Sequence, residues 1–180
     1  LHRGRGGGHV FSCCISGVLT GRAGGANRCG ERSWQYKCAM IVRDLQPADL
    51  AAAAVLLGQL GYPLSETELQ ERLDRVTAAS DHAVRVAESE GVIVGLIHVF
   101  ERPALEKPCE AVVQSLVVDG RHRGTGIGVL LMRDAEAWAR SRRLASVTLY
   151  TRVDRDAARA FYERLGYQRS ATSHQMRCDL

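Results

Sequence analysis

Hydrophobic residues recur along residues 40–180 in two patterns that follow each other in turn. Apolar or β-rich runs, which are typical of strands, occur at residues 40–43, 83–88, 92–100, 111–118 and 146–151, and a last strand is expected at 173–179. Helix-favouring composition or helical apolar spacing predicts helices over residues 49–60, 65–79, 126–140 and 154–165. This order predicts an antiparallel front followed by a strand–helix–strand–helix unit, and therefore an α/β domain with a mixed sheet.

Capping and turn residues support several of these boundaries. Ser65, with Glu68 three residues later, forms a capping box, so a helix is expected to begin there. Gly91 separates two β-rich runs and indicates a hairpin. Asp154 is expected to cap the last helix.

The formal net charge of +4 is unevenly distributed. Residues 1–39 hold six Lys/Arg, one Glu and nine Gly with little periodicity, so a disordered extension is expected ahead of a domain at 40–180. As an alternative, residues 10–19 resemble the apolar region of a signal peptide after a basic start, although serines interrupt them. Residues 40–180 hold 18 Lys/Arg against 19 Asp/Glu, a balance that argues against nucleic-acid binding.

Two further absences narrow the function classes. No apolar run approaches the roughly 18 residues of a membrane helix, so no membrane contact is expected. The six cysteines form no pair of CxxC clusters, so we expect no metal site. Nothing in the cysteine pattern demands an oxidising compartment, and a cytoplasmic location is expected.

The segment with the clearest chemistry is Arg123-Gly124-Thr125-Gly126-Ile127-Gly128, where a strand passes into a helix. Such a turn directs several backbone N–H groups at one point near the positive end of the helix dipole, which suits a phosphate. Glycine allows close approach because it has no Cβ. Arg121 and Arg123 add positive charge beside the turn.

Three kinds of phosphate loop can be compared with this segment. A P-loop needs a Lys after its last glycine, and none follows here. A dinucleotide fold needs GxGxxG, whereas the spacing here is Gly124-x-Gly126-x-Gly128. The pattern (Gln/Arg)-x-x-Gly-x-(Gly/Ala) is satisfied by residues 123–128. A tight strand-to-helix turn without a ligand is the structural alternative.

Three segments carry a resemblance to a known family. They are the strand and loop at 115–131, the stretch Ala158-Arg159-Ala160-Phe161-Tyr162-Glu163-Arg164-Leu165-Gly166-Tyr167, and the opening 41–49. With them the chain resembles the GNAT family of N-acetyltransferases over residues 40–178. The resemblance implies a mixed, mostly antiparallel central sheet flanked by helices, in which two parallel central strands, here 111–118 and 146–151, splay apart.

The resemblance also implies where acetyl-CoA, the cosubstrate, would bind. The backbone of Leu116, Val117 and Val118 would pair with its pantetheine arm, as an added strand does. Its pyrophosphate would lie on the loop made by Arg123, Gly124, Thr125, Gly126, Ile127, Gly128 and Val129. A backbone N–H near Val117 or Val118 would polarise the thioester carbonyl.

The expected reaction is direct attack of a primary amine on the thioester, and two side chains are candidates for its proton transfers. Tyr162 matches the family's tyrosine and is the candidate acid for the departing thiolate; a core aromatic is the alternative. Gln114 stands where many relatives carry a basic Glu, and an amide cannot take that proton. Glu110 is the candidate substitute, unless it is a solvated carboxylate or the amine arrives neutral.

Two function classes therefore stay open for the domain. The first is acetyl transfer to a small-molecule or peptide amine. The second is a non-catalytic acetyl-CoA sensor, which Gln114 favours and Tyr162 opposes. Acidic residues of the second helix region would attract a cationic amine, unless they form an ordinary solvated face; they are Glu66, Glu68, Glu71, Asp74 and Asp81. The resemblance also suggests a homodimer.

Overall fold

The computed structural model describes residues 40–179 as helices and strands on one mixed sheet. The predicted extension and the signal-peptide-like run lie outside the described residues. The strands are β1 (Met40–Asp44), β2 (His82–Ser89), β3 (Val92–Arg102), β4 (Glu110–Val118) and β5 (Val147–Leu149). The helices are α1 (Leu50–Leu60), α2 (Glu66–Thr77), α3 (Ile127–Ser141) and α4 (Asp156–Arg164), with 3-10 turns at Pro47–Asp49 and Gly120–His122.

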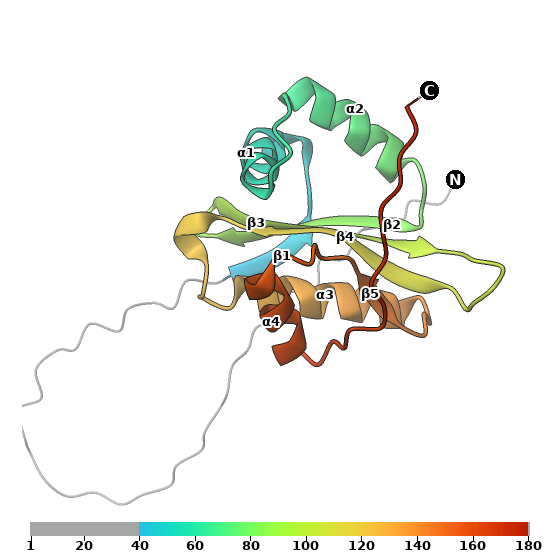
Figure 1. Cartoon of the computed structure of the whole chain (residues 1–180). Coiled ribbons are helices and arrows are strands. Elements are labelled where there is room, and N and C mark those ends of the chain that lie inside the picture. The colour runs from blue at the N-terminus through green and yellow to red at the C-terminus, as the bar shows by residue number, and fades with distance from the viewer. Residues whose placement is uncertain (1–39, 180) are drawn as a thin grey trace, which may run out of the picture.

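The sheet has the order β1-β2-β3-β4-β5. The first four strands pair antiparallel and β4 pairs parallel with β5, which confirms the predicted mixed sheet. Figure 1 shows α1 and α2 on one face of the sheet and α3 and α4 on the other. The capping box at Ser65 is confirmed, because Glu68 N donates to the Ser65 hydroxyl and Ser65 N donates to the Glu68 carboxylate.

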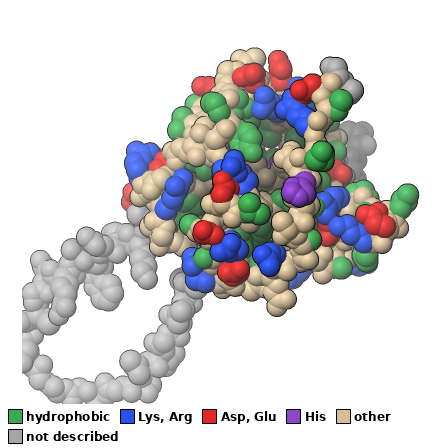
Figure 2. All heavy atoms as spheres, in the orientation of Figure 1, with side chains coloured by type: hydrophobic (Ala, Val, Ile, Leu, Met, Phe, Trp, Pro, Cys, Tyr) green, Lys and Arg blue, Asp and Glu red, His purple; other side chains and the backbone are tan. Residues whose placement is uncertain are grey.

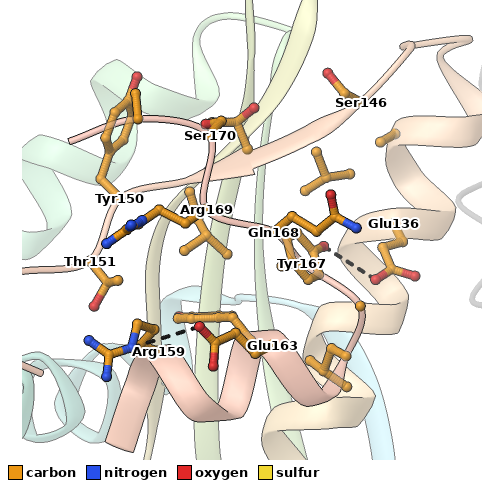
Figure 3. Close-up of a pocket in the computed structure, with 18 of the residues that line it drawn as sticks. Glu136, Ser146, Tyr150, Thr151, Arg159, Glu163, Tyr167, Gln168, Arg169 and Ser170 are labelled. Carbon is orange, nitrogen blue, oxygen red and sulfur yellow. Dashed lines mark hydrogen bonds and ion pairs between the residues drawn. The ribbon is translucent and has the colours of Figure 1, made fainter. Parts of the chain in front are cut away.

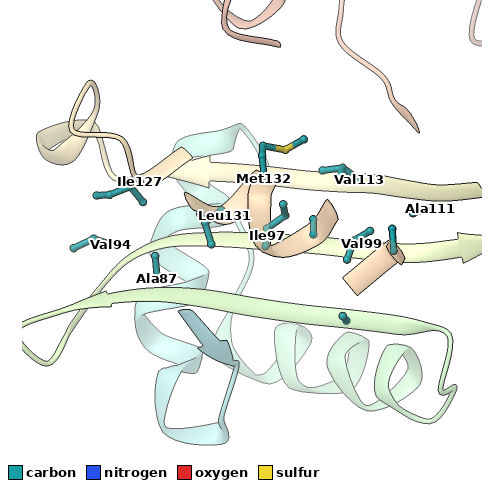
Figure 4. Packing of buried hydrophobic residues seen from close by; sticks show 12 residues of the cluster. Ala87, Val94, Ile97, Val99, Ala111, Val113, Ile127, Leu131 and Met132 are labelled. Carbon is teal, nitrogen blue, oxygen red and sulfur yellow. The ribbon is translucent and has the colours of Figure 1, made fainter. Parts of the chain in front are cut away.

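The face toward α3 holds the larger hydrophobic core. Ile127, Leu131 and Met132 of α3 are 1%, 0% and 0% exposed, so the start of this helix is fixed against the sheet (Figure 4). They pack on inward residues of three strands, among them Ala87, Val94, Ile97, Val99 and Val113. Burial of this apolar stripe anchors the loop that precedes α3, since each fully buried large aliphatic side chain contributes about 1.5–3 kcal/mol.

A β-bulge in the middle of β4 changes which side chains face this core. On β3, His98 and Val99 are neighbours, yet their partners on β4 are Ser115 and Val113, so Gln114 has no partner on β3. The extra residue reverses the alternation of β4. Val113 before the bulge and Leu116 after it therefore both pack on the α3 side, although three positions separate them.

Two details at the C-terminal end differ from prediction. The strand expected at 173–179 is wrong: these residues are extended, exposed and unpaired. They are mostly polar and have no apolar face to bury on a sheet, so β5 becomes an edge strand. Asp154 is not the cap of α4, which Arg155 precedes without a side-chain cap. The Asp154 carboxylate instead forms an ion pair with the Arg152 guanidinium, 2.7 Å away.

Candidate active site

The turn between β4 and α3 is ordered by a buried carboxylate. Asp119 is 5% exposed, and its Oδ1 accepts from Arg121 N at 2.8 Å while its Oδ2 accepts from the Arg121 guanidinium at 2.9 Å. These hydrogen bonds hold the pKa of Asp119 well below its usual range. The sequence analysis missed Asp119; the dipeptide Asp119-Gly120 is a turn signal that was available.

The glycine loop that follows presents a run of free donors. Among the described residues, no backbone N–H from Gly124 to Val129 donates to another group of the protein, and the first that does is Leu130, to Gly126 O at 3.0 Å. Gly126 has φ +92°, a conformation that side-chain-bearing residues rarely adopt. The N-terminus of the fifteen-residue α3 adds its positive dipole. The loop therefore has the donors and field of an anion site.

The same loop is in close contact with α4. A Cβ at Gly128 would lie 3.2 Å from the Phe161 ring, so the ring occupies the space that a side chain would need. Phe161 in turn stacks edge-on against Tyr162, with ring centroids 5.1 Å apart. This contact favours glycine at 128 and places α4 directly beside the loop.

The strands β4 and β5 are paired over a short stretch only. Ala111, Val112 and Val113 pair with Val147, Thr148 and Leu149, and the register ends there. Beyond the bulge, Leu116 to Val118 pair with β3 but have no β5 partner among the described residues. One edge of β4 is thus open from Gln114 to the glycine loop, apart from Val118 O, which accepts from the Arg123 guanidinium at 3.2 Å.

Tyr162, the candidate acid, is half-buried on the face of α4 that packs against the core. Burial raises its pKa, and the nearby Arg155 opposes that shift. Its phenol is therefore protonated at neutral pH. No hydrogen bond from the hydroxyl to another described residue occurs, whereas the hydroxyl of neighbouring Tyr167 donates to Glu136 at 3.2 Å.

Glu110, the candidate base, lies at the start of β4, at the end away from the glycine loop, and its carboxylate is already hydrogen-bonded. Its side chain is 10% exposed and accepts from Lys107 Nζ at 2.8 Å, from Thr148 Oγ1 at 2.9 Å and from the Arg102 guanidinium. The hydrogen bond from Lys107, with those from Arg102 and Thr148, lowers the pKa of Glu110 to about 2. A carboxylate held in this way is a poor proton acceptor at neutral pH. These contacts favour a structural role, in place of the base that the sequence suggested.

Most acidic residues near α2 are also occupied locally. Glu68 closes the capping box, Asp74 accepts from Gln70 at 2.6 Å, and Glu71 lies 4.0 Å from Arg75. Asp81 lies 3.8 Å from His82. The contacts of Glu68, Glu71 and Asp74 are those of a solvated helix face. The partners of Glu68 and Asp74 are uncharged, so these two carboxylates keep their negative charge.

A pocket of about 780 Å³ lies between β5, α4 and the extended tail (Figure 3). It includes Tyr162, the Arg159–Glu163 ion pair of α4 and Tyr150 at the end of β5. Its walls follow the outer edge of β5, where the predicted last strand is missing. The pocket therefore lies along β5 and α4, and no residue of β4 lines it.

Surface charge and the described helices and side chains bear on nucleic-acid, membrane and metal binding. Figure 2 shows acidic and basic side chains interspersed on the visible face, without a large basic patch. No helix among residues 40–179 is long and apolar enough to cross a membrane. Within the same residues, no group of three or more His, Cys, Asp or Glu is placed to hold a metal ion.

Comparison with known proteins agrees with this geometry. Residues 50–167 match the model of the acetyltransferase (GNAT) family. The chain belongs to that family. It is 33% identical over 144 residues to a glucosamine 6-phosphate N-acetyltransferase of Trypanosoma brucei brucei, covering 77% of this chain and 95% of the relative.

Two solved structures show the same fold. One is an acetyltransferase of Trypanosoma brucei, with TM-score 0.65 and 31% identity, covering 78% of this chain and 99% of that one. The other is the glucosamine-6-phosphate N-acetyltransferase of Arabidopsis thaliana, with TM-score 0.67 and 23% identity, covering 78% and 99%. As a GNAT member the chain is an N-acetyltransferase whose acetyl donor is acetyl-CoA.

The residues present suit this donor. The free N–H groups from Gly124 to Val129 match a pyrophosphate in charge and hydrogen-bonding capacity. The open edge of β4 offers backbone groups to an extended amide chain such as pantetheine. The sequence did not predict the bulge at Gln114, which lies directly after Val113, the last residue of β4 that pairs with β5. The available signal was that the apolar residues Val113 and Leu116 are three positions apart, whereas residues on one face of a regular strand are an even number of positions apart.

Proposed function

We propose that the domain transfers the acetyl group of acetyl-CoA to a primary amine by direct attack of the amine on the thioester. The observation that carries the proposal is the continuous path from the open β4 edge to the unpartnered N–H groups of the glycine loop. Acetyl-CoA supplies an activated acyl group, and the protein supplies position and proton transfer.

In this proposal the donor is held by backbone groups. Leu116, Val117 and Val118 pair with the pantetheine arm, and residues 123–129 bind the pyrophosphate. A backbone N–H of β4 near Val117 stabilises charge on the carbonyl oxygen, since a preorganised donor in a partly dry site acts on developing charge.

Tyr162 acts as the acid in this proposal. Its protonated phenol lies on the helix that contacts the glycine loop through Phe161, and it has no other described hydrogen-bond partner. Transfer of its proton to the departing sulfur would avoid release of a free thiolate. Glu110 is not proposed as the base, because its hydrogen bonds lower its pKa to about 2.

For the acceptor we propose an amino sugar phosphate, with glucosamine 6-phosphate as the compound to test first. The support is the similarity to the Trypanosoma brucei brucei relative, which extends over 95% of that protein. A cytoplasmic location and a homodimer stay predictions; sedimentation of the purified chain measures the latter.

The test is release of CoA thiol from acetyl-CoA with a panel of amines: glucosamine 6-phosphate, spermidine, kanamycin and a peptide with a free N-terminus. Turnover with glucosamine 6-phosphate alone would support both parts of the proposal. Turnover with another amine would contradict the acceptor only. Thermal stabilisation by acetyl-CoA without turnover of any amine would instead favour the non-catalytic binder.

A further inference from the structure

A pair of histidines lies on the sheet face that α1 and α2 cover. His82 of β2 and His98 of β3 face each other, with Nδ1 of His82 3.0 Å from Nε2 of His98. Both rings stack with Phe100 or with each other, at centroid distances of 5.2 Å for His82–Phe100 and 5.3 Å for His82–His98. The geometry is that of a hydrogen bond between two imidazoles in a fixed orientation.

The pair continues to a carboxylate. Nε2 of His82 lies 3.8 Å from Oδ1 of Asp81, and this oxygen is buried without a hydrogen-bond partner among the described residues. Asp81, His82 and His98 therefore form a row in which each ring has one nitrogen toward the next member. Such a row is able to pass a proton by changes of tautomer.

His98, the last member of this row, lies on the strand next to the place where β4 and β5 stop pairing. His98 is the strand partner of Ser115, the residue directly after the bulge at Gln114. The β4–β5 pairing ends at Val113, one position before that bulge. His98 shares its face of β3 with Leu96, which packs in the core under α1 and α2. It is thus one strand away from the place where the thioester is proposed to lie.

The remaining charged groups near this face are engaged elsewhere. On α2, Glu71 and Asp74 contact residues of their own helix. Further along the same face of β3, Arg102 is bound to Glu110. On β4, Gln114 and Ser115 carry no charge. Burial, and secondarily His82, lower the pKa of His98 to about 4, so its ring is neutral at pH 7 and does not repel an ammonium group.

We propose that His98 and His82 form a proton relay that deprotonates the acceptor ammonium, the task for which Gln114 is unsuited. This inference rests on the proposed function. One N–H bond of the ammonium breaks, its electron pair stays on nitrogen, and the proton goes to Nδ1 of His98. The Nε2 proton of His98 passes to Nδ1 of His82, and the Nε2 proton of His82 leaves to water beside Asp81.

The neutral amine then attacks the acyl carbon, and the C–S electron pair leaves with the sulfur. Tyr162 gives that sulfur a proton, and the second proton lost by the nitrogen replaces the one Tyr162 gave. One proton per turnover reaches solvent. After the product leaves, solvent removes the Nδ1 proton of His98, the proton between the rings moves back to Nε2 of His98, and Nε2 of His82 takes a proton from solvent, which restores both starting tautomers. His98 therefore carries the extra proton only transiently.

The test compares kcat/KM from pH 6.5 to 9.5 for the wild type, His98→Gln and His82→Phe, using the panel amine that the wild type acetylates fastest. His82→Phe keeps an aromatic ring stacked on Phe100 and breaks the relay. His174→Gln, in the exposed tail, is the matched control. Thermal unfolding and acetyl-CoA binding are measured for every variant.

We expect His98→Gln to lower kcat/KM at least about 100-fold at pH 7, with acetyl-CoA binding changed less than about twofold. The defect should shrink to below about tenfold at pH 9.5, because a much larger fraction of the amine has then lost its proton without help from the protein. His82→Phe should show a smaller defect with the same pH trend. If His98→Gln does not fold, the trend in His82→Phe decides.

Two results would overturn the relay alone: a kcat/KM for both variants within threefold of wild type at pH 7, or a defect that is equally large at every pH, which a structural role would produce. Absence of turnover by the wild type with every amine would overturn the proposed function, and the relay with it. The two failures are therefore distinguished by whether the wild type is active.

Discussion

The two halves of β4 differ in how their polar groups are used. Before the bulge, Ala111 to Val113 pair with strands on both sides, and the Glu110 carboxylate has three partners. After the bulge, one strand edge has no described partner apart from Val118 O, which Arg123 contacts, and the following N–H groups from Gly124 to Val129 have none. Buried polar groups normally have hydrogen-bond partners. The half of β4 whose polar groups have partners therefore indicates a structural role, and the half whose polar groups lack them indicates a binding site.

The largest effect is expected from changing the spacing within the open half. Insertion of one alanine between Ser115 and Leu116 would shift the alternation by one residue and turn Leu116 to Val118 to the wrong face of the sheet. We expect a loss of at least about 4 kcal/mol in the free energy of unfolding, measured by urea denaturation. Gln114→Ala keeps the bulge and should change stability by less than about 0.5 kcal/mol. Equal stability of the insertion and the substitution would contradict the assignment of these residues to opposite faces of β4.

The next effect concerns the open half. Gly126→Val forces a β-branched residue to φ +92°, which costs about 1–3 kcal/mol and displaces the donors of the loop. We expect acetyl-CoA affinity, measured by calorimetry, to fall about 100-fold. Gly58→Ala is the matched control, because a Cβ there meets nothing within 4 Å; it should bind like wild type and gain up to about 1 kcal/mol in stability. Unchanged acetyl-CoA affinity in Gly126→Val would show that the loop does not bind acetyl-CoA.

A third comparison uses two hydroxyls on neighbouring tyrosines. Tyr162→Phe removes the hydroxyl without a described partner, and we expect kcat to fall about 100-fold with little change in acetyl-CoA affinity. Tyr167→Phe removes a hydroxyl bound to Glu136, and should cost about 1 kcal/mol in stability while leaving kcat within twofold. Steady-state kinetics and thermal unfolding measure both. The same kcat for the two variants would exclude Tyr162 as the acid.

The smallest effect is expected in the closed half. Glu110→Gln should cost about 2 kcal/mol of stability and change kcat less than threefold, because the carboxylate holds Lys107, Thr148 and Arg102 together. If the folded variant instead turns over about 100-fold more slowly than wild type, Glu110 is restored as the base.

The acid dependence of unfolding sharpens this point. The pKa of Glu110 is about 2 in the folded protein, and an unfolded glutamate titrates near ~4.3, so the unfolded chain binds more protons between these values. The stabilisation is fully present above about pH 5 and is lost as the pH falls toward 2. Denaturation curves of Glu110→Gln should lack this part of the acid slope, while exposed Glu106→Gln should keep it.

Local signals predicted much of the fold. The capping box at Ser65, the hairpin at Gly91 and the glycine loop at 123–128 depend on a few neighbouring residues, and all three are present in the structure. Two predictions were wrong for different reasons. Asp154 does not cap α4, because its carboxylate is bound by Arg152 two residues away, and residues 173–179 have no strand partner among the described residues.

The sequence by itself determined the order of helices and strands up to α4, the glycine turn before α3 and the family to which the chain belongs, because these follow from short-range backbone preferences and motif spacing. Only the tertiary structure decided which polar groups already have hydrogen-bond partners within the protein. It placed Lys107 and Arg102 on Glu110, left the N–H groups of the loop free, and brought His82 within 3.0 Å of His98. A side chain's capacity to donate, accept or titrate is set by neighbours from other strands, and no local pattern specifies them.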